Sequence, residues 1–232
     1  MSNTMAEKIF QLNKKISKLK ITLPDNYDAI NPYCIDDNNI KKITNIFYQK
    51  YYNDLNDRYL ILGSSPARRK SAITSIPFED AKHLEEISGI NLNFKYINNQ
   101  ASKFLEEVIL RYGGYEKFYS KFYMNFVCPI GIIKNVNEKP INCNYYDNKK
   151  VEKELYPIIV KSLKDMIKIG INTSICFCIG SNQNYKTLLK INKEHHLFDK
   201  IIPLEHPRYI MQYNSKNKKE YLQKYLSNLN NV

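Results

Sequence analysis

The sequence lacks the long apolar runs and glycine-rich motifs that mark several common protein classes. No apolar run approaches the ~18–20 residues of a membrane span. The N-terminal stretch MSNTMAEKIFQLNKKISKLKI is charged and periodic, without the apolar core of a signal peptide. Neither G-x-G-x-x-G nor G-x-x-x-x-G-K-[ST] occurs, which argues against an α/β enzyme that binds a small phosphorylated substrate. We therefore expect a cytoplasmic protein without a membrane partner.

Cysteine is also scarce, and its spacing does not suggest a metal site. The chain has 5 cysteines, an odd number, with no C-x-x-C pair. Cys176 and Cys178 alternate within an apolar run, so both should point to one face of a strand. A zinc or iron–sulfur centre would need closer pairing and more ligands. We interpret the cysteines as small buried residues in a reducing compartment, and we expect neither a metal cluster nor a cofactor.

Positive charge, in contrast, is plentiful. The 35 Lys and Arg residues outnumber the 23 Asp and Glu residues and give a net charge of +12. Such an excess favours a polyanionic partner, either nucleic acid or an anionic membrane surface. The many Lys, Asn, Ile and Tyr residues are also typical of an AT-rich genome, which by itself raises the lysine content. Charge alone is therefore a weak indicator of function.

The apolar pattern predicts a single α/β domain. At 232 residues, 43% hydrophobic and 25% charged, the chain fits one soluble domain of ordinary size. We expect a three-layer α/β/α sandwich around a central, mostly parallel four-stranded sheet, with residues 1–57 as an N-terminal helical extension packed on it. The predicted strands are 59–62, 122–133, 174–179 and 200–207; the predicted helices are 5–19, 38–54, 80–88, 101–112, 115–122, 150–169, 181–196 and 218–229, and the polar stretch 135–149 is predicted to be a loop.

The unusual residues gather at the predicted carboxyl ends of the strands, where ligands bind in open parallel sheets. The strand 59–62 runs into Gly63-Ser64-Ser65-Pro66-Ala67, and Ile76-Pro77-Phe78 follows about a dozen residues later. Asn125 precedes Cys128-Pro129 at the end of the second strand. The last strand ends in His206-Pro207-Arg208.

These motifs, in this order, resemble those of the uracil-DNA glycosylase superfamily, and most closely its single-strand-selective monofunctional branch. The resemblance covers roughly residues 58–228. It implies a DNA glycosylase that flips a base out of DNA and hydrolyses its glycosidic bond. The candidate residues at these motifs and beside them are Gly63, Ser64, Pro66, Phe78 and Asn125 for binding the base, Ser65, His206 and Asp80 for catalysis, and Arg68, Arg69 and Arg208 for binding DNA.

The resemblance also implies a role for each of these residues. Phe78 would stack on the base and Asn125 would read its amide edge, while His206 would donate a hydrogen bond to the carbonyl oxygen that gains charge. Arg208 stands where the family more often has serine, in a segment that enters the DNA. No lysine suggests itself as a Schiff-base nucleophile, so no strand-cleaving activity is expected.

Ser65 is the main departure, because these relatives carry a water-positioning asparagine there. Serine can orient a water but does not act as a base at neutral pH without help. Two carboxylates could substitute, Asp80 after Phe78 and Glu205 beside His206, and we favour Asp80 because it follows the loop that would stack on the base. Asp80 is placed at least equally well to cap the helix that begins near residue 80.

Simpler interpretations exist for each of these residues. Gly63–Pro66 can be a tight turn, Phe78 and His206 can be core residues, Asn125 can end a strand, and the cations 68–70 can belong to a solvated loop. Their coincidence at one sheet edge favours a site. The leading hypothesis is a monomeric glycosylase of base excision repair that removes uracil, or a related deaminated base, preferably from single strands. The alternative is a DNA-binding protein that keeps the fold with weakened catalysis.

Overall fold

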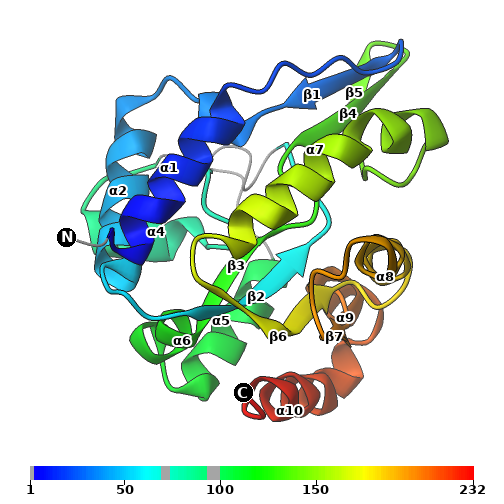
Figure 1. The fold of residues 1–232 in the computed structure, drawn as a ribbon. Helices are drawn as coiled ribbons and strands as arrows, with labels where there is room; N and C mark the ends of the chain where they lie inside the picture. Colours follow the sequence, from blue (N-terminus) through cyan, green and yellow to red (C-terminus); the bar gives the residue numbers. More distant parts are fainter. Residues whose placement is uncertain (1–2, 69–73, 93–99) are drawn as a thin grey trace.

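A four-stranded parallel sheet forms the centre of the computed structural model, which describes residues 3–68, 74–92 and 100–232. In spatial order its strands are β3 (Phe122–Phe126), β2 (Arg58–Gly63), β6 (Ile171–Ile179) and β7 (Lys200–Leu204). All three neighbouring pairs are parallel. Helices lie against both faces of this sheet (Figure 1). The expected α/β fold around a parallel four-stranded sheet is therefore confirmed.

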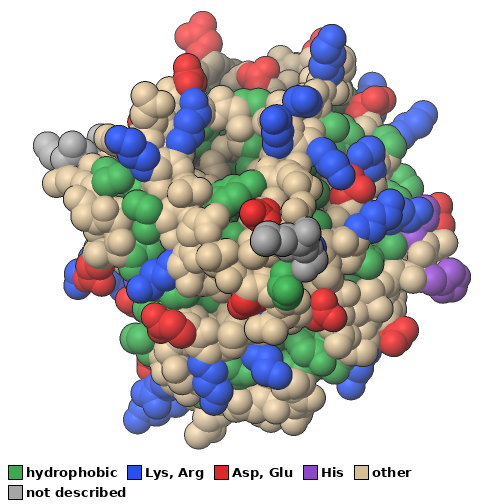
Figure 2. Space-filling view, turned by 60° about the vertical axis from the view of Figure 1, so that its left-hand side comes forward, with side chains coloured by type: hydrophobic (Ala, Val, Ile, Leu, Met, Phe, Trp, Pro, Cys, Tyr) green, Lys and Arg blue, Asp and Glu red, His purple; other side chains and the backbone are tan. Residues whose placement is uncertain are grey.

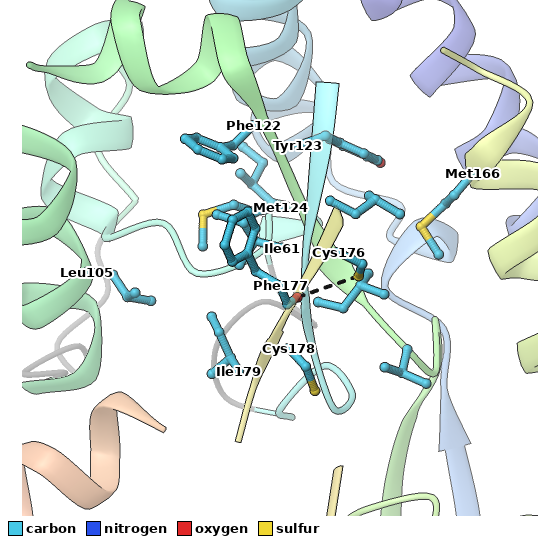
Figure 3. Close-up of a cluster of buried hydrophobic side chains, with 14 of the residues drawn as sticks. Ile61, Leu105, Phe122, Tyr123, Met124, Met166, Cys176, Phe177, Cys178 and Ile179 are labelled. Carbon is cyan, nitrogen blue, oxygen red and sulfur yellow. Dashed lines mark hydrogen bonds between the residues drawn. The ribbon is translucent and has the colours of Figure 1, made fainter. Parts of the chain in front are cut away.

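Side chains alternate between the two faces of the sheet and build a core on each. Figure 3 shows Cys176 and Cys178 on the side of Met166, whereas Phe177 and Ile179 lie on the side of Leu105. Cys176 and Cys178 are buried free thiols, in agreement with their predicted position on one face of a strand.

The helices agree closely with those predicted from the apolar spacing. Several begin at a side chain that accepts backbone hydrogen bonds, as Asp37, Asp80 and Asn148 do. The helices are α1 (Met5–Ser17), α2 (Asn38–Tyr52), α4 (Ala81–Ser88), α5 (Gln100–Tyr112), α6 (Tyr115–Lys121), α7 (Lys149–Ile167), α8 (Gln183–His195), α9 (Pro207–Tyr213) and α10 (Lys218–Leu229), with 3-10 turns η1 (Pro32–Cys34) and η2 (Ser215–Asn217).

A second, antiparallel sheet is the main feature that the pattern did not predict. It consists of β1 (Tyr27–Ile30), β4 (Gly131–Val136) and β5 (Lys139–Cys143) in the order β1-β4-β5. The strand predicted over 122–133 is therefore two strands, and the predicted loop 135–149 contains β5. The prediction was wrong because β5 is mostly exposed and polar, so it lacks an apolar alternation.

The N-terminal segment 1–57 is accordingly not wholly helical, since β1 pairs with β4. Its helices nevertheless contribute to the main hydrophobic core through Ile9, Phe47 and Tyr48. The hydroxyl of Tyr52 donates a hydrogen bond to the carbonyl of Phe122 at 3.1 Å and ties α2 to the central sheet.

Positive and negative side chains are interspersed on the face that Figure 2 displays. On the face shown in Figure 2, Lys and Arg side chains alternate with Asp and Glu and do not form a patch of one sign. In the described part of the chain, no helix is long and apolar enough to cross a membrane.

Candidate active site

The strand ends that carry the sequence motifs meet at one edge of the central sheet. Gly63 pairs with Phe126 in register, and Ile179 pairs with Leu204. The pairing continues past the strands. The amide of Cys128 donates to the carbonyl of Ser64 at 2.9 Å, and the amide of Gly180 donates to the carbonyl of Leu204 at 2.7 Å. Parallel pairing thus brings the motifs together, as predicted.

A cavity of about 560 Å³ opens at this edge. Its walls come from the turn after β2, the turn before α4, the end of β5 and the segment after β7. A second cavity of about 580 Å³ shares part of the same wall, including Ser64 and His206. The predicted site residues that line the first cavity are Ser64, Ser65, Pro66, Phe78, His206 and Arg208.

Two aromatic rings form one wall of the first cavity. The rings of Phe78 and Phe126 lie 5.0 Å apart between centroids, at an interplanar angle of 34°. Phe78 has a φ of 66°, a left-handed conformation that costs a non-glycine residue about 1–3 kcal/mol. A Cβ atom on Gly63 would lie only 2.3 Å from Cζ of Phe78. Gly63 is therefore the residue that lets this ring approach the strand end.

His206 is held in one orientation by the helix that it begins. Its Nδ1 accepts a hydrogen bond from the backbone N–H of Arg208 at 3.1 Å, which makes His206 the N-cap of α9. An accepting Nδ1 carries no proton, so the proton of the neutral ring resides on Nε2. His206 lines both cavities and can act there as a neutral hydrogen-bond donor.

Polar groups of the segment after β5 face the turn after β2. Ser64 Oγ donates to Oδ1 of Asn144 at 3.0 Å. The backbone amide of Asn144 in turn donates to Asp147 at 2.8 Å, and its side-chain amide donates there at 3.3 Å. These bonds orient the Asn144 amide in the cavity wall.

Asn125 does not join this group. Its side-chain amide donates to Tyr123 Oη at 2.8 Å, and its Oδ1 accepts from the backbone amide of Phe126 at 2.8 Å. It is buried and is not among the described residues that line either cavity. Because side chains alternate along β3, Phe126 faces the cavity instead.

Asp80 does not reach the cavity either. Its Oδ1 accepts from the amide of Lys82 at 2.9 Å, and its Oδ2 accepts from Ser102 Oγ at 2.8 Å. Both carboxylate oxygens are thus used to begin α4 and tie it to α5. The preceding residue, Glu79, lines the cavity.

Glu205 lies beside His206 in the wall of the second cavity. Its Oε1 is 2.6 Å from Nζ of Lys224. Its Oε2 is buried and has no hydrogen-bond partner among the described residues. It is therefore the carboxylate with an unused acceptor near the site.

The predicted DNA-binding cations have different surroundings. Arg208 is exposed, lines the first cavity and donates from Nε to Gln212 at 3.0 Å. The backbone amide of Arg68 donates to Oδ1 of Asn142 at 3.1 Å. Arg69 lies outside the described residues.

No cluster of three or more His, Cys, Asp or Glu side chains suited to a metal ion occurs in residues 3–68, 74–92 and 100–232.

Comparison with known proteins assigns the family. The sequence profile of the Uracil DNA glycosylase superfamily matches residues 49–230. The crystal structure of wild-type SMUG2 from Pedobacter heparinus matches the fold with a TM-score of 0.91 and 41% sequence identity, covering 99% of each chain. None of the curated proteins compared with the sequence matches it. The chain belongs to the uracil-DNA glycosylase superfamily. It is a DNA glycosylase, and DNA is its substrate.

The structure of this glycosylase adds residues that the motifs did not indicate. Asn144 was missed because β5 was predicted to be a loop. Glu79 was overlooked in favour of its neighbour Asp80. Tyr209 and Tyr213 on α9 line the cavity and are 48% and 76% exposed; their exposure could not be read from the sequence, because α9 was not predicted.

Proposed function

We propose that this glycosylase is monofunctional and hydrolyses the glycosidic bond of uracil, or of a related deaminated base, in base excision repair. We further propose that it acts inside the cell as a monomer and prefers single-stranded DNA. The main support for hydrolysis of the glycosidic bond is the orientation of His206, which is fixed at the cavity by the hydrogen bond from Arg208 N–H to Nδ1. A neutral imidazole that presents Nε2–H is suited to a base that leaves as an anion.

Cleavage of the bond leaves an oxocarbenium-like sugar and places negative charge on the base. His206 Nε2 donates a hydrogen bond to the base carbonyl oxygen that gains this charge. The neutral ring carries no charge of its own that could attract the undamaged phosphate backbone into the cavity. A preorganised donor of this kind contributes about 3–4 kcal/mol to the stabilisation of the transition state.

The base enters the first cavity and stacks on Phe78, which is already in place against Phe126. Asn144, oriented by Ser64 and Asp147, is the amide suited to read the donor and acceptor pattern of the base edge. This replaces the expected contribution of Asn125, which is buried and is not among the described residues that line either cavity, whereas Asn144 lines the first one. Gly63 and Pro66 shape the turn beneath the base.

The attacking water is held by Ser65, which lines the cavity on the turn after β2. Of the two carboxylates considered, Glu205 is better placed to assist, because its Oε2 has no partner among the described residues. Asp80 uses both oxygens in α4 and with Ser102. We therefore propose Ser65 and Glu205 as the groups that orient the water.

Arg68 and Arg208 hold the phosphates around the flipped nucleotide, and Arg69 is expected to contribute beside them. Tyr209 and Tyr213 offer exposed rings at the mouth of the same cavity. Bases in single strands are free to stack on such rings, whereas paired bases are not. This supports the proposed preference for single strands.

The test compares the wild type with His206→Ala on single- and double-stranded oligonucleotides that carry uracil, hypoxanthine or xanthine. The wild type should produce an abasic site without strand cleavage, faster in single strands. His206→Ala should lower the single-turnover rate by about 10²–10³-fold and leave the Kd for DNA almost unchanged.

His195→Ala is the matched control, because His195 lies at the end of α8 and lines neither cavity. An unchanged rate in His206→Ala would remove the proposed role of His206. DNA binding without an abasic product from any base would favour the non-catalytic alternative.

A further inference from the structure

The carboxyl group of Glu79 is buried directly beside the aromatic wall of the active site. Glu79 follows Phe78, and its side chain is only 4% exposed. Its Oε1 accepts a hydrogen bond from the hydroxyl of Tyr119 on α6. Its Oε2 lies 3.9 Å from Nε2 of His83 on α4. The side chain therefore connects the turn that carries Phe78 to two helices.

The surroundings of Glu79 favour its neutral form. Burial raises its pKa to about 8. Burial also lowers the pKa of His83, so this imidazole is a poor counterion. Among the described residues, the titratable groups that interact with Glu79 include no Lys or Arg. They are Tyr48, Tyr51 and Tyr52 on α2, Asp80 and His83 at α4, Glu106 on α5, and Tyr115 and Tyr119 on α6.

His83 is itself held in place by aromatic residues. Its ring stacks on that of Tyr115 at 3.7 Å between centroids, and its Nε2 lies 3.2 Å from the hydroxyl of Tyr51. The pocket around Glu79 is thus rigid and lined by hydroxyl and imidazole groups. It accepts an uncharged carboxyl group better than a carboxylate.

Phe78 needs such an anchor because its backbone is left-handed, with a φ of 66°. A non-glycine residue keeps this conformation only when its neighbours over-determine it. On its C-terminal side, Glu79 is bound to Tyr119, and Asp80 is bound to α4 and Ser102. Release of Glu79 to solvent would free the turn and move the Phe78 ring away from Gly63.

We propose that Glu79 is a positioning residue that, as a neutral carboxylic acid, ties the turn to Tyr119 and so keeps Phe78 in place to stack on the substrate base. This inference rests on the proposed function, since the stacking role of Phe78 belongs to it. Glu79 acts through Phe78, and its own carboxyl group does not contact the base.

The role predicts a specific dependence on pH. We call the turn docked when Glu79 is buried against Tyr119, and released when its side chain is in solvent. In the docked turn the pKa of Glu79 is about 8, whereas in the released turn its pKa is near the ordinary 4.5. The docked turn is therefore fully favoured below pH 4.5, and this advantage is lost progressively as the pH rises to about 8. Above that pH the carboxylate favours release.

The experiment measures kcat and KM on a single-stranded uracil oligonucleotide from pH 5.5 to 9 for the wild type, E79Q and E79A. At pH 6, E79A should raise KM about tenfold, because Phe78 no longer stays in place to stack on the base. E79Q should keep KM near the wild-type value, because an amide oxygen still accepts from Tyr119. The ratio of kcat/KM between E79Q and the wild type should rise about tenfold from pH 6 to pH 9. E86Q removes an exposed carboxylate from α4, the helix that follows Glu79, and should follow the wild type at every pH.

A double-mutant cycle separates positioning from general support of the fold. In a Phe78→Ala background, E79A should cause no further loss, because the ring that it positions is absent. In an active enzyme, two results would overturn the role of Glu79. One is a ratio of kcat/KM between E79Q and the wild type that stays constant with pH, and the other is full additivity of the E79A and Phe78→Ala losses in the cycle. A wild type that is inactive on every oligonucleotide would overturn the proposed function, and the role of Glu79 with it.

Discussion

At the scale of single residues, the GSSP turn shows how neighbouring positions serve different purposes. Gly63 leaves room for the ring of Phe78, and Ser64 donates to Asn144. Ser65 and Pro66 line the cavity directly. The turn therefore connects the aromatic wall of the cavity with its polar wall, and Gly63 has the strictest steric requirement in the turn.

Replacement of Gly63 by Ala should displace the aromatic wall. The added Cβ would lie 2.3 Å from Cζ of Phe78, so the ring must move. We expect a stability loss of about 1–3 kcal/mol from overpacking, and a larger relative loss in kcat/KM for uracil DNA. Thermal unfolding and steady-state kinetics measure both. In a Phe78→Ala background the same substitution should have little further effect, and a full additive loss there would contradict the steric explanation.

At the scale of secondary-structure elements, the starts of two helices place the site. His206 begins α9 and Asp80 begins α4, each by accepting a backbone amide. In His206 the capping bond selects the tautomer that donates from Nε2. In Asp80 the cap and Ser102 use both oxygens, so the residue supports the wall and does not face the base.

The two possible roles of Asp80 can be distinguished by measuring stability and activity together. Asp80→Ala should cost about 0.5–2 kcal/mol of stability through the lost cap. For a domain of this size, each kcal/mol corresponds to a shift in Tm of about 2–4 °C. Activity per folded molecule should change little, and Asp80→Asn, which still caps, should recover most of the stability. A hundredfold loss of kcat at unchanged Tm would instead identify Asp80 as catalytic.

At the scale of the whole molecule, the charge of +12 provides attraction to DNA without a concentrated patch on the face that Figure 2 displays. Contacts to phosphates depend on salt, whereas stacking of bases on rings depends on it much less. The exposed tyrosines of α9 and the cation Arg208 lie at the same cavity. Their contributions to binding can therefore be separated by ionic strength.

We expect Arg208→Ala to reduce the slope of log K against log salt for single-stranded DNA by about 0.7, the value for one phosphate contact. Tyr213→Ala should weaken binding by about 1–3 kcal/mol, the usual contribution of one stacked base, and leave the slope unchanged. Fluorescence anisotropy titrations between 50 and 200 mM salt, roughly the range over which such slopes are measured, provide both quantities. A change of slope in Tyr213→Ala would argue against stacking.

The sequence by itself was sufficient for the parallel sheet, for most helices and for the gathering of the motifs at one sheet edge. The reason is physical: apolar periodicity reports burial, and parallel strands necessarily bring their carboxyl ends together. Gly63, Ser65, Phe78 and His206 could thus be predicted as neighbours although they lie far apart in the chain.

Only the tertiary structure decided which side chains face the cavity. Asn125 and Phe126 are adjacent in sequence, yet alternation along β3 turns one into the core and the other towards the cavity. Asp80 caps α4 and accepts from Ser102, so the preceding residue, Glu79, is the carboxylate that lines the cavity. Asn144 depended on a polar strand, β5, whose partners are set by pairing across the chain and not by its own composition. Local pattern determines which elements form; register and packing determine what each side chain contacts.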